Sequence, residues 1–421
     1  MTAALKGTAR RTFRSLQIRN YRLYFIGQIV SFSGTWMQTV AQMWLVYRLT
    51  SSGTALGVTM ALQFVPMMLA GAWGGVIADR FDKRHILMWT QSVQAALAIL
   101  LGTLVATGAV RLWMVYALAF ALGCVVVIDN PTRQSFAAEM VGPEDLTNAV
   151  GLNSAIFTSA RVIGPAVAGV VISLVDLAPC FFVNGASYVA VLAALRAMDP
   201  RALHRRRPVP RSPGQLREGL RYVWRRPVLR STLLLVAVIG TLAFNFGVLL
   251  PVMARTEFSG GAATFGLMSA VMGAGTLLGA LTAASRPTPT RTMLYGSALA
   301  YGLLIIIAGL APTLSLTLAV LVPMGAAGIA FLATANATLQ LHADDHMRGR
   351  VMSLHGMVFL GSTPIGSPIA GWISEQLGVR AAFFLGGIGA MIAAVGSVWW
   401  LCRMRAERGA ESDLDWERTA A

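Results

Sequence analysis

Charge is scarce in this 421-residue chain, because Asp, Glu, Lys and Arg together make up only 12% of it. Soluble domains carry about 25% of these residues, so a water-facing fold of this length would lack the charge to cover its surface. Cysteine is scarcer still: Cys124, Cys180 and Cys402 lie far apart and show no metal-ligand spacing. These shortages exclude a soluble enzyme, a disulfide scaffold and a zinc protein, and no metal or cofactor is expected.

Apolar residues make up 56% of the chain and gather in long runs. The net charge of +16 suggests no nucleic-acid partner, because the cations lie between apolar runs and form no continuous basic face. A membrane helix needs about 20 mostly apolar residues. Twelve runs qualify, which predicts an all-α membrane protein with twelve transmembrane helices. The predicted spans are Tyr21–Tyr47, Thr54–Ala78, His85–Thr107, Leu112–Asn130, Thr147–Leu174, Pro179–Met198, Leu229–Met253, Ala262–Ser285, Thr292–Leu310, Thr313–Gln340, Val351–Ser374 and Ala381–Cys402.

The loop cations predict the orientation of these spans. When alternate loops are assigned to one side, the opposite side keeps only Arg48, Arg111, Arg255 and Arg380, and Arg161 lies within a span. Because cytoplasmic loops are enriched in Lys and Arg, both termini are expected in the cytoplasm. The first twenty residues do not resemble a removable signal peptide. A multi-pass protein of a bacterial inner membrane is therefore expected.

One long hydrophilic break divides the spans into two sets of six. The expected parts are a cytoplasmic segment 1–20, a six-helix bundle 21–198, a cytoplasmic linker 199–228, a second six-helix bundle 229–402 and a cytoplasmic tail 403–421. In the linker, Leu216, Leu220, Val223 and Trp224 follow a helical period with Arg residues between them. This pattern predicts an amphipathic helix whose Arg side chains meet anionic headgroups, and a solvated linker is the alternative.

The two halves repeat each other at a constant offset of 202 residues. Ile163–Gly169 falls on Ile365–Gly371, and Phe181-Phe182 falls on Phe383-Phe384. Parallel repeats of this kind are typical of transporters that rock between two states, so the repeat predicts two pseudo-symmetric bundles and alternating access.

The loop between the second and third spans reads GVIADRFDKR from Gly75 to Arg84. It resembles the signature of the major facilitator superfamily, G-x-x-x-D-R-x-G-R-R, with Asp82 in place of the usual Gly. The resemblance implies the major facilitator fold and a conformational latch. In that latch Asp79 contacts the start of the eleventh helix and Lys83 pairs with Asp129 at the end of the fourth. The alternative is that these charges only fix a turn. The expected latch residues are Gly75, Asp79, Arg80, Lys83, Arg84 and Asp129.

The fifth span resembles the antiporter motif of the superfamily, although two of its glycines are alanines here. The matching positions include Gly151, Ala160, Gly164, Pro165 and Gly169. Close helix packing by small residues is the alternative. The surrounding sequence, with Asp129–Ser135, Asp145–Ala149 and Ala160–Pro165, resembles the enterobactin-exporter-like subgroup, which includes macrolide-efflux proteins. This resemblance implies efflux of small molecules driven by a proton gradient.

No Asp or Glu is placed deep in a predicted span, so Asp129 near the end of the fourth is the candidate for proton coupling. Arg161 lies about 21 Å into the fifth span, at about 1.5 Å per residue. Either it attracts an anionic or carbonyl-rich substrate, or it is a structural hydrogen-bond hub. The candidate cavity residues are Gln28, Trp36, Arg161, Asn245 and Asn336, and interhelical packing is the alternative for each.

These observations predict a monomeric secondary transporter that exports an amphipathic small molecule, siderophore-, drug- or macrolide-like, in exchange for protons. The alternatives are a proton-coupled symporter that imports a nutrient and a non-transporting membrane sensor. The expected partners are the small molecule, protons and the lipid bilayer. An enzyme is not expected, because the sequence shows no Ser/His/Asp set, paired carboxylates or metal ligands.

Overall fold

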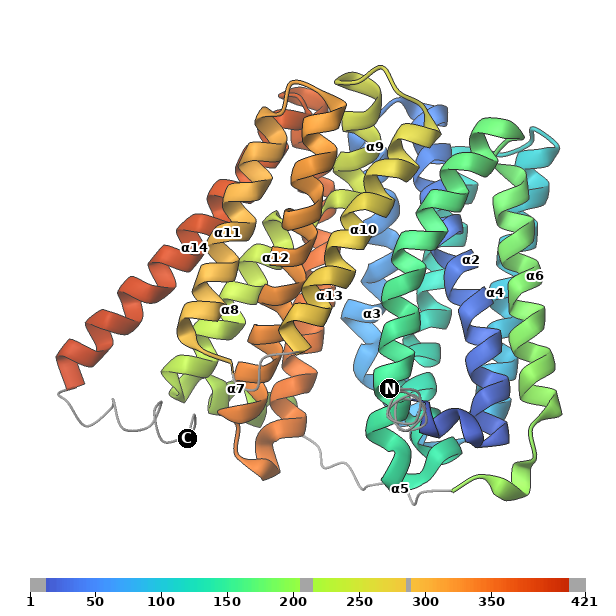
Figure 1. The fold of residues 1–421 in the computed structure, drawn as a ribbon, viewed down its shortest axis with the longest axis horizontal. Helices are drawn as coiled ribbons and strands as arrows, with labels where there is room; N and C mark the ends of the chain where they lie inside the picture. Colours follow the sequence, from blue (N-terminus) through green and yellow to red (C-terminus); the bar gives the residue numbers. More distant parts are fainter. Residues whose placement is uncertain (1–12, 205–214, 285–288, 409–421) are drawn as a thin grey trace, which may run out of the picture. The chain divides into compact units, whose positions relative to one another are not determined.

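The computed structural model describes residues 13–204, 215–284 and 289–408, and these residues form helices and connections without a β-strand (Figure 1). The short 3₁₀ helices are η1 (Arg14–Gln17) and η2 (Pro200–Ala202). The α-helices are α2 (Arg19–Thr50), α3 (Gly53–Arg80), α4 (Lys83–Ala106), α5 (Leu112–Leu174), α6 (Ala178–Ala197), α7 (Gln215–Arg225), α8 (Pro227–Leu242), α9 (Phe246–Thr256), α10 (Ala262–Ala284), α11 (Arg291–Leu310), α12 (Leu314–Leu341), α13 (Asp345–Gln376) and α14 (Val379–Arg408).

Helix α5 contains two of the predicted spans. It is 63 residues long, and Gly142 interrupts it with φ 72° and ψ 179°, a backbone conformation that residues with a Cβ rarely adopt. In Figure 1 one arm descends to the α5 label and the second arm rises from it. The first arm continues past Asn130, where the predicted span ends, and carries Glu139 on its helical part. The helix therefore continues beyond the predicted end of the span.

The predicted span Leu229–Met253 is broken into α8 and α9. Residues 243–245 lie between the two helices, and polar groups satisfy the backbone there. The hydroxyl of Tyr301 donates to the carbonyl of Ala243 at 3.4 Å, and Asn245 Nδ2 donates to the carbonyl of Thr241 at 2.7 Å. These two bonds pair carbonyl groups at the break, where burial without a hydrogen-bond partner would be costly.

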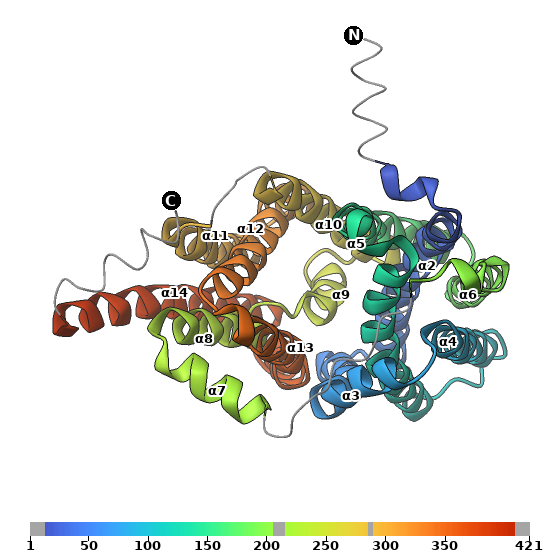
Figure 2. The same cartoon turned by 90° about the horizontal axis from the view of Figure 1, so that it is seen from below.

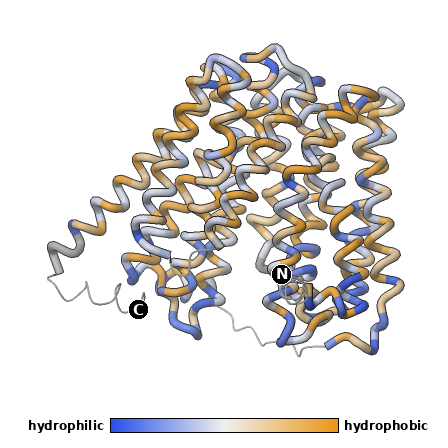
Figure 3. Tube along the Cα trace, in the orientation of Figure 1, coloured by the Kyte–Doolittle hydropathy of each residue, from blue (hydrophilic) through white to orange (hydrophobic). Residues whose placement is uncertain are grey.

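Nine stretches of the described helices are long and apolar enough to cross a membrane by length and composition. One of them is the whole of α5, which holds two spans, and another joins α8 and α9. Helices α2 and α13 have the required length, but their polar side chains lower their hydropathy. With these two helices and the second arm of α5, the twelve predicted spans are accounted for, so the all-α fold class is confirmed. Along the helices in Figure 3, hydrophobic colour dominates.

The chain forms two compact units. Unit 1 takes in Met1–Leu49, Val65–Pro210 and Gly261–Ala270, and unit 2 takes in Thr50–Phe64, Arg211–Gly260 and Val271–Ala421. In unit 1, α4 lies beside α6 and the first arm of α5, as Figures 1 and 2 show for α4 and α6. In unit 2, α11 packs between α12 and α14, and α8 packs against α13 and α14.

Each unit also takes in the start of a helix whose remainder belongs to the other unit. The start of α3 belongs to unit 2 because Gly57 touches the backbone of Ser367 in α13. The start of α10 belongs to unit 1 because a Cβ at Gly266 would lie 2.6 Å from the carbonyl oxygen of Pro165 in α5. Glycine permits both backbone contacts, since any side chain would occupy the same space. The predicted division into two six-helix bundles stays a prediction.

Candidate functional site

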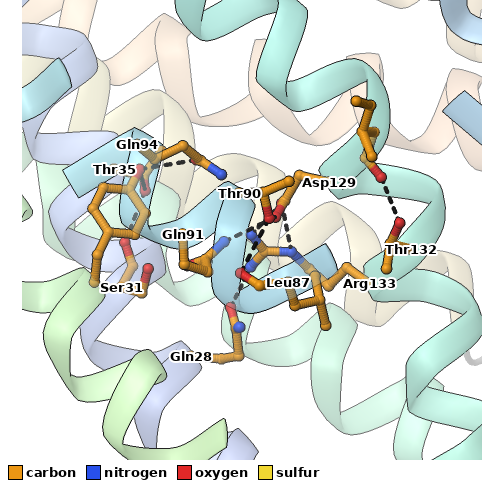
Figure 4. Close-up of polar contacts among 12 residues, drawn as sticks. Gln28, Ser31, Thr35, Leu87, Thr90, Gln91, Gln94, Asp129, Thr132 and Arg133 are labelled. Carbon is orange, nitrogen blue, oxygen red and sulfur yellow. Dashed lines mark hydrogen bonds and ion pairs between the residues drawn. The ribbon is translucent and has the colours of Figure 1, made fainter. Parts of the chain in front are cut away.

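A buried ion pair lies on the first arm of α5. Asp129 is 2% exposed, and Arg133 follows it by one helical turn, so the two side chains share one face of the helix. Arg133 Nε lies 3.1 Å from Asp129 Oδ2, and its Nη2 contacts the same oxygen (Figure 4). A buried carboxylate is stable only when it is paired and hydrogen-bonded, and Arg133 supplies the pairing.

Two neighbouring helices complete the environment of this pair. From α4, Thr90 Oγ1 donates to Asp129 Oδ1 at 2.7 Å, and Gln91 Nε2 donates to the same oxygen at 2.9 Å. From α2, the Oε1 atom of Gln28 accepts a hydrogen bond from Arg133 Nη1. Figure 4 shows these side chains converging on the two charges. Side chains from three helices therefore surround one carboxylate and one guanidinium.

Aromatic rings extend from this pair along α2 and the second arm of α5. The guanidinium of Arg133 lies 5.1 Å from the ring centre of Phe32, and Phe157 packs edge-on against Phe32 at 5.4 Å. Phe157 also packs against Trp36 at 6.0 Å, and Arg161 lies 5.1 Å from the Trp36 ring. Three rings thus connect two guanidinium groups within unit 1. The structure brings the predicted residues Gln28, Trp36 and Arg161 into this one region.

The predicted pairing of Lys83 with Asp129 was wrong. Lys83 Nζ lies 2.6 Å from Glu139 Oε1, and both side chains are largely buried, with 12% and 8% of their surface exposed. Asp129 is held by Arg133 instead. Because the first arm of α5 continues as a helix beyond Asn130, it presents Glu139 to the start of α4. The acid that pairs with Lys83 lies beyond the predicted end of the span.

The rest of the predicted latch lies at the junction of α3 and α4. Arg84 Nε donates to the carbonyl oxygen of Leu195 at 2.7 Å, and Arg80 is exposed at the end of α3. Gly75 and Asp79 are half-buried in the last turns of α3. Asp82, which replaces the usual glycine, caps α4 by accepting a hydrogen bond from the His85 backbone at 3.1 Å. The replacement therefore has a local structural role.

The antiporter-like residues differ in their surroundings. Ala160 is buried, and a Cβ at Gly164 would lie 2.5 Å from Trp36 Cβ in α2. Gly169 approaches the backbone of Ala263, and a Cβ at Gly151 would meet nothing within 4 Å. Close helix packing therefore accounts for Gly164 and Gly169 and does not account for Gly151.

The candidate cavity residues of unit 2 lie on separate helices. Asn245 is 2% exposed, and its Oδ1 atom accepts a hydrogen bond from Ser367 Oγ at 3.0 Å, beside the break between α8 and α9. Asn336 is half-buried in α12, and its Oδ1 atom accepts a hydrogen bond from Gln340 at 2.5 Å. Asn245 therefore has a hydrogen-bond partner on another helix, whereas the bond between Gln340 and Asn336 stays within one turn of α12.

Two carboxylates at helix ends have lowered pKa values. Hydrogen bonds from the Ser52 hydroxyl and the Thr54 backbone, at 2.5 and 2.9 Å, lower the pKa of Glu375, which follows the predicted eleventh span. Partial burial of Asp176 opposes its charge, but a hydrogen bond from Arg48 at 2.7 Å outweighs this effect and lowers the pKa of Asp176. Both acids are therefore charged at neutral pH.

Sequence reasoning missed the residues that bind Asp129, which are Arg133, Thr90 and Gln91, and it missed Glu139, which binds Lys83. A helical continuation of the fourth span would have revealed Arg133, because it follows Asp129 by four residues. No sequence signal identified Thr90 and Gln91, because their proximity to Asp129 depends on how α4 packs against α5. Within the described ranges, no group of three or more His, Cys, Asp or Glu could hold a metal ion.

Comparison with known families gives a match over nearly the whole chain. The family model described as transmembrane secretion effector, of the major facilitator superfamily, matches residues 10–419. The chain is 23% identical to the staphyloferrin A transporter of Staphylococcus aureus over 381 residues, which are 87% of this chain and 92% of the relative. It is 24% identical to the multidrug efflux pump Tap of Mycobacterium tuberculosis over 374 residues (86% and 88%). It is 23% identical to macrolide efflux protein A of Streptococcus pyogenes over 391 residues (87% and 93%).

Solved structures share the fold. A bacterial homolog of the human lysosomal transporter Spinster matches with a TM-score of 0.70 and 16% identity, over 90% of this chain and 94% of that chain. A bacterial homologue of the iron transporter ferroportin also matches with a TM-score of 0.70 and 16% identity, over 91% and 98%. At this identity the likeness concerns the fold alone, and it agrees with the predicted major facilitator fold.

Proposed function

Because the chain belongs to the transmembrane secretion effector family of major facilitator transporters, we propose that it exports an amphipathic small molecule in exchange for protons. It is a multi-pass membrane transporter, and its relatives include proteins named for drug and macrolide efflux. The cargo we propose is siderophore-, drug- or macrolide-like. The proposed location is a bacterial cytoplasmic membrane, where the chain acts as a monomer with both termini inside.

The observation that carries this proposal is the buried pair of Asp129 and Arg133. An ionised carboxylate inside a membrane span is costly, so such residues usually mark proton or substrate pathways. Asp129 is almost fully buried, and hydrogen bonds from α4 and α5 hold both of its oxygens. We assign the exchanged proton to this carboxylate.

Protonation of Asp129 would change what Arg133 binds. A proton on the carboxylate removes the negative charge, so the attraction between the two side chains falls. Arg133 then keeps its contacts with Gln28 and the ring of Phe32, and its remaining N–H groups become available to an oxygen of the cargo. Proton binding and cargo binding are thereby linked through a single guanidinium group, because each changes the charge that faces it.

The rings beside Arg133 suit an amphipathic cargo. Phe32, Trp36 and Phe157 offer apolar faces, and 44% of the surface of Phe157 is exposed. Arg161 lies over the Trp36 ring and adds a second cation. We propose that this region contacts the apolar part and an anionic or carbonyl group of the cargo. Replacement of Arg161 by Gln should then weaken transport of an anionic cargo while protein levels hold. Unchanged transport would leave Arg161 with a structural role only.

The cargo itself is found by comparing a deletion strain with its complemented partner. Mass spectrometry of medium and cell extract should show a metabolite that is trapped inside the deletion strain and depleted outside. Loss of uptake of a medium component, with secretion unchanged, would contradict export and favour a nutrient symporter.

Proton coupling is tested in proteoliposomes that contain a pH-sensitive dye. Asp129→Asn should lower cargo-dependent proton movement by about tenfold or more, because Asp129 is the carboxylate that pairs with Arg133, whereas Glu139 pairs with Lys83. Asp176→Asn is the matched control: Asp176 also pairs with an arginine, Arg48, but both side chains are about half exposed. Proton movement that survives Asp129→Asn at the level of this control would exclude Asp129 as the coupling group.

A further inference from the structure

Helix α7 has one face docked onto unit 2. Val223 is fully buried among residues of α8, α12 and α13. Glu218 pairs with Arg350 at 2.5 Å, and the Tyr222 hydroxyl accepts a hydrogen bond from the Asp344 backbone at 2.9 Å. Figure 2 shows α7 lengthwise, whereas α8 and α13 beside it are seen closer to end-on. The helix therefore lies across the ends of the spans that it touches.

The opposite face of α7 is open and amphipathic. Leu220 and Trp224 are one turn apart and remain 46% and 54% exposed. Arg217, Arg221 and Arg225 form an exposed stripe beside them at the same spacing. An exposed leucine and an exposed indole beside arginines suit the boundary between acyl chains and headgroups. There the apolar groups contact acyl chains and the arginines contact phosphates.

Arg230 of α8 connects this face to α14. Its guanidinium lies 4.1 Å from the ring centre of Trp400 and 5.9 Å from that of Trp224. Within the described ranges, no side-chain hydrogen bond joins Arg230 to another residue. Contacts with the ring faces hold a guanidinium group in place while its N–H edge stays available to a phosphate group. One arginine of α8 thus contacts an indole of α7 and an indole of α14.

Helix α14 also has an exposed apolar side, which ends next to Trp400, the residue that contacts Arg230. Ile392, Val395 and Trp399 are 67%, 57% and 61% exposed and recur at helical spacing. This side suits contact with acyl chains, and Arg403, whose guanidinium lies 5.7 Å from the Trp399 ring, follows it at the end. The change from apolar to cationic residues along this side is typical of a helix end at the membrane–water interface.

We propose that Arg230, Trp224, Trp400 and the exposed arginines of α7 bind the headgroup of an anionic phospholipid. The charge of the surface selects the ligand: the one acid of α7, Glu218, is paired with Arg350, whereas the charged side chains beside Leu220 and Trp224 are arginines. The phosphodiester faces Arg230 and Arg221, and the acyl chains lie along Leu220 and Trp399. This site is independent of the transported cargo and of proton coupling.

The test uses the purified full-length protein in a neutral detergent. Native mass spectrometry should detect bound phosphatidylglycerol, and much less phosphatidylcholine at the same concentration. Arg230→Gln should weaken phosphatidylglycerol binding about fivefold, and Arg221→Gln by a similar factor, because a basic residue near an anionic surface contributes about 1 kcal/mol. Arg221 is exposed, so its replacement leaves packing intact. Arg255→Gln is the matched control, because Arg255 is an exposed arginine at the end of α9.

Three results would overturn the proposal. The first is equal retention of phosphatidylglycerol by Arg230→Gln, Arg221→Gln and the Arg255→Gln control. The second is equal binding of phosphatidylcholine and phosphatidylglycerol by the unchanged protein. The third is displacement of the lipid by inorganic phosphate at matched concentration, because the acyl chains would then contribute nothing and the site would be one for free phosphate.

Discussion

Lys83 and Glu139 form a buried ion pair whose loss is measurable at the scale of single residues. Removal of one partner leaves an uncompensated buried charge, which costs about 3–5 kcal/mol. We expect Lys83→Met to lower the free energy of unfolding by about that amount. The double variant Lys83→Met/Glu139→Leu should recover most of the loss, because neither charge then remains buried. Thermal unfolding of the purified variants in detergent measures both effects.

A second mutant cycle, with Asp129, is the control for this prediction. Residues in direct contact show coupling energies of about 0.5–3 kcal/mol, whereas separate sites add independently. Lys83 contacts Glu139, and Asp129 contacts Arg133, so the coupling between Lys83 and Asp129 should be close to zero. A stronger coupling of Lys83 with Asp129 than with Glu139 would contradict the pairing described above.

At the scale of elements, the contact between α13 and α8 depends on Gly366. A Cβ there would collide with the backbone carbonyl of Thr241, which cannot move without moving α8. We expect Gly366→Ala to lower the free energy of unfolding by about 1–3 kcal/mol, the usual cost of overpacking. The melting temperature of the purified variant in detergent measures this loss.

Gly356 is the matched control in the same helix. A Cβ at Gly356 would meet nothing within 4 Å, so Gly356→Ala should be neutral or should stabilise α13 by up to about 1 kcal/mol. Equal losses in the two variants would mean that helix propensity, and not the contact with α8, governs both positions.

At the same scale, the sequence predicted which segments are helices better than where they break. Long apolar runs indicated every span, but the first arm of α5 continues past Asn130 to the break at Gly142. The interruption between α8 and α9 was not predicted either, because Tyr301, which donates to Ala243, comes from a helix far along the chain. Breaks of this kind depend on partners that only packing supplies.

At the scale of the whole molecule, the loop cations predict that the C-terminus lies in the cytoplasm. A green fluorescent protein fused after Ala421 should therefore fluoresce, and alkaline phosphatase fused there should be inactive. As the control, alkaline phosphatase inserted at Gly108, in the connection between α4 and α5, should be active. Phosphatase activity at Ala421 together with none at Gly108 would reverse the predicted orientation.

The sequence by itself determined the membrane class, the twelve spans and the resemblance to major facilitator transporters. Composition and periodicity are local properties, so they can be read without knowing which residues meet. It also indicated Asp129, Gln28, Trp36 and Arg161 as residues of interest, but it did not indicate their partners.

Only the tertiary structure decided those partners. It paired Asp129 with Arg133, paired Lys83 with Glu139, and placed Arg230 in contact with Trp224 and Trp400. The physical reason is that a buried charge takes the partner that helix packing brings within hydrogen-bond distance. That choice depends on where each helix ends and which face it presents, and both are settled by contacts between segments distant in the chain.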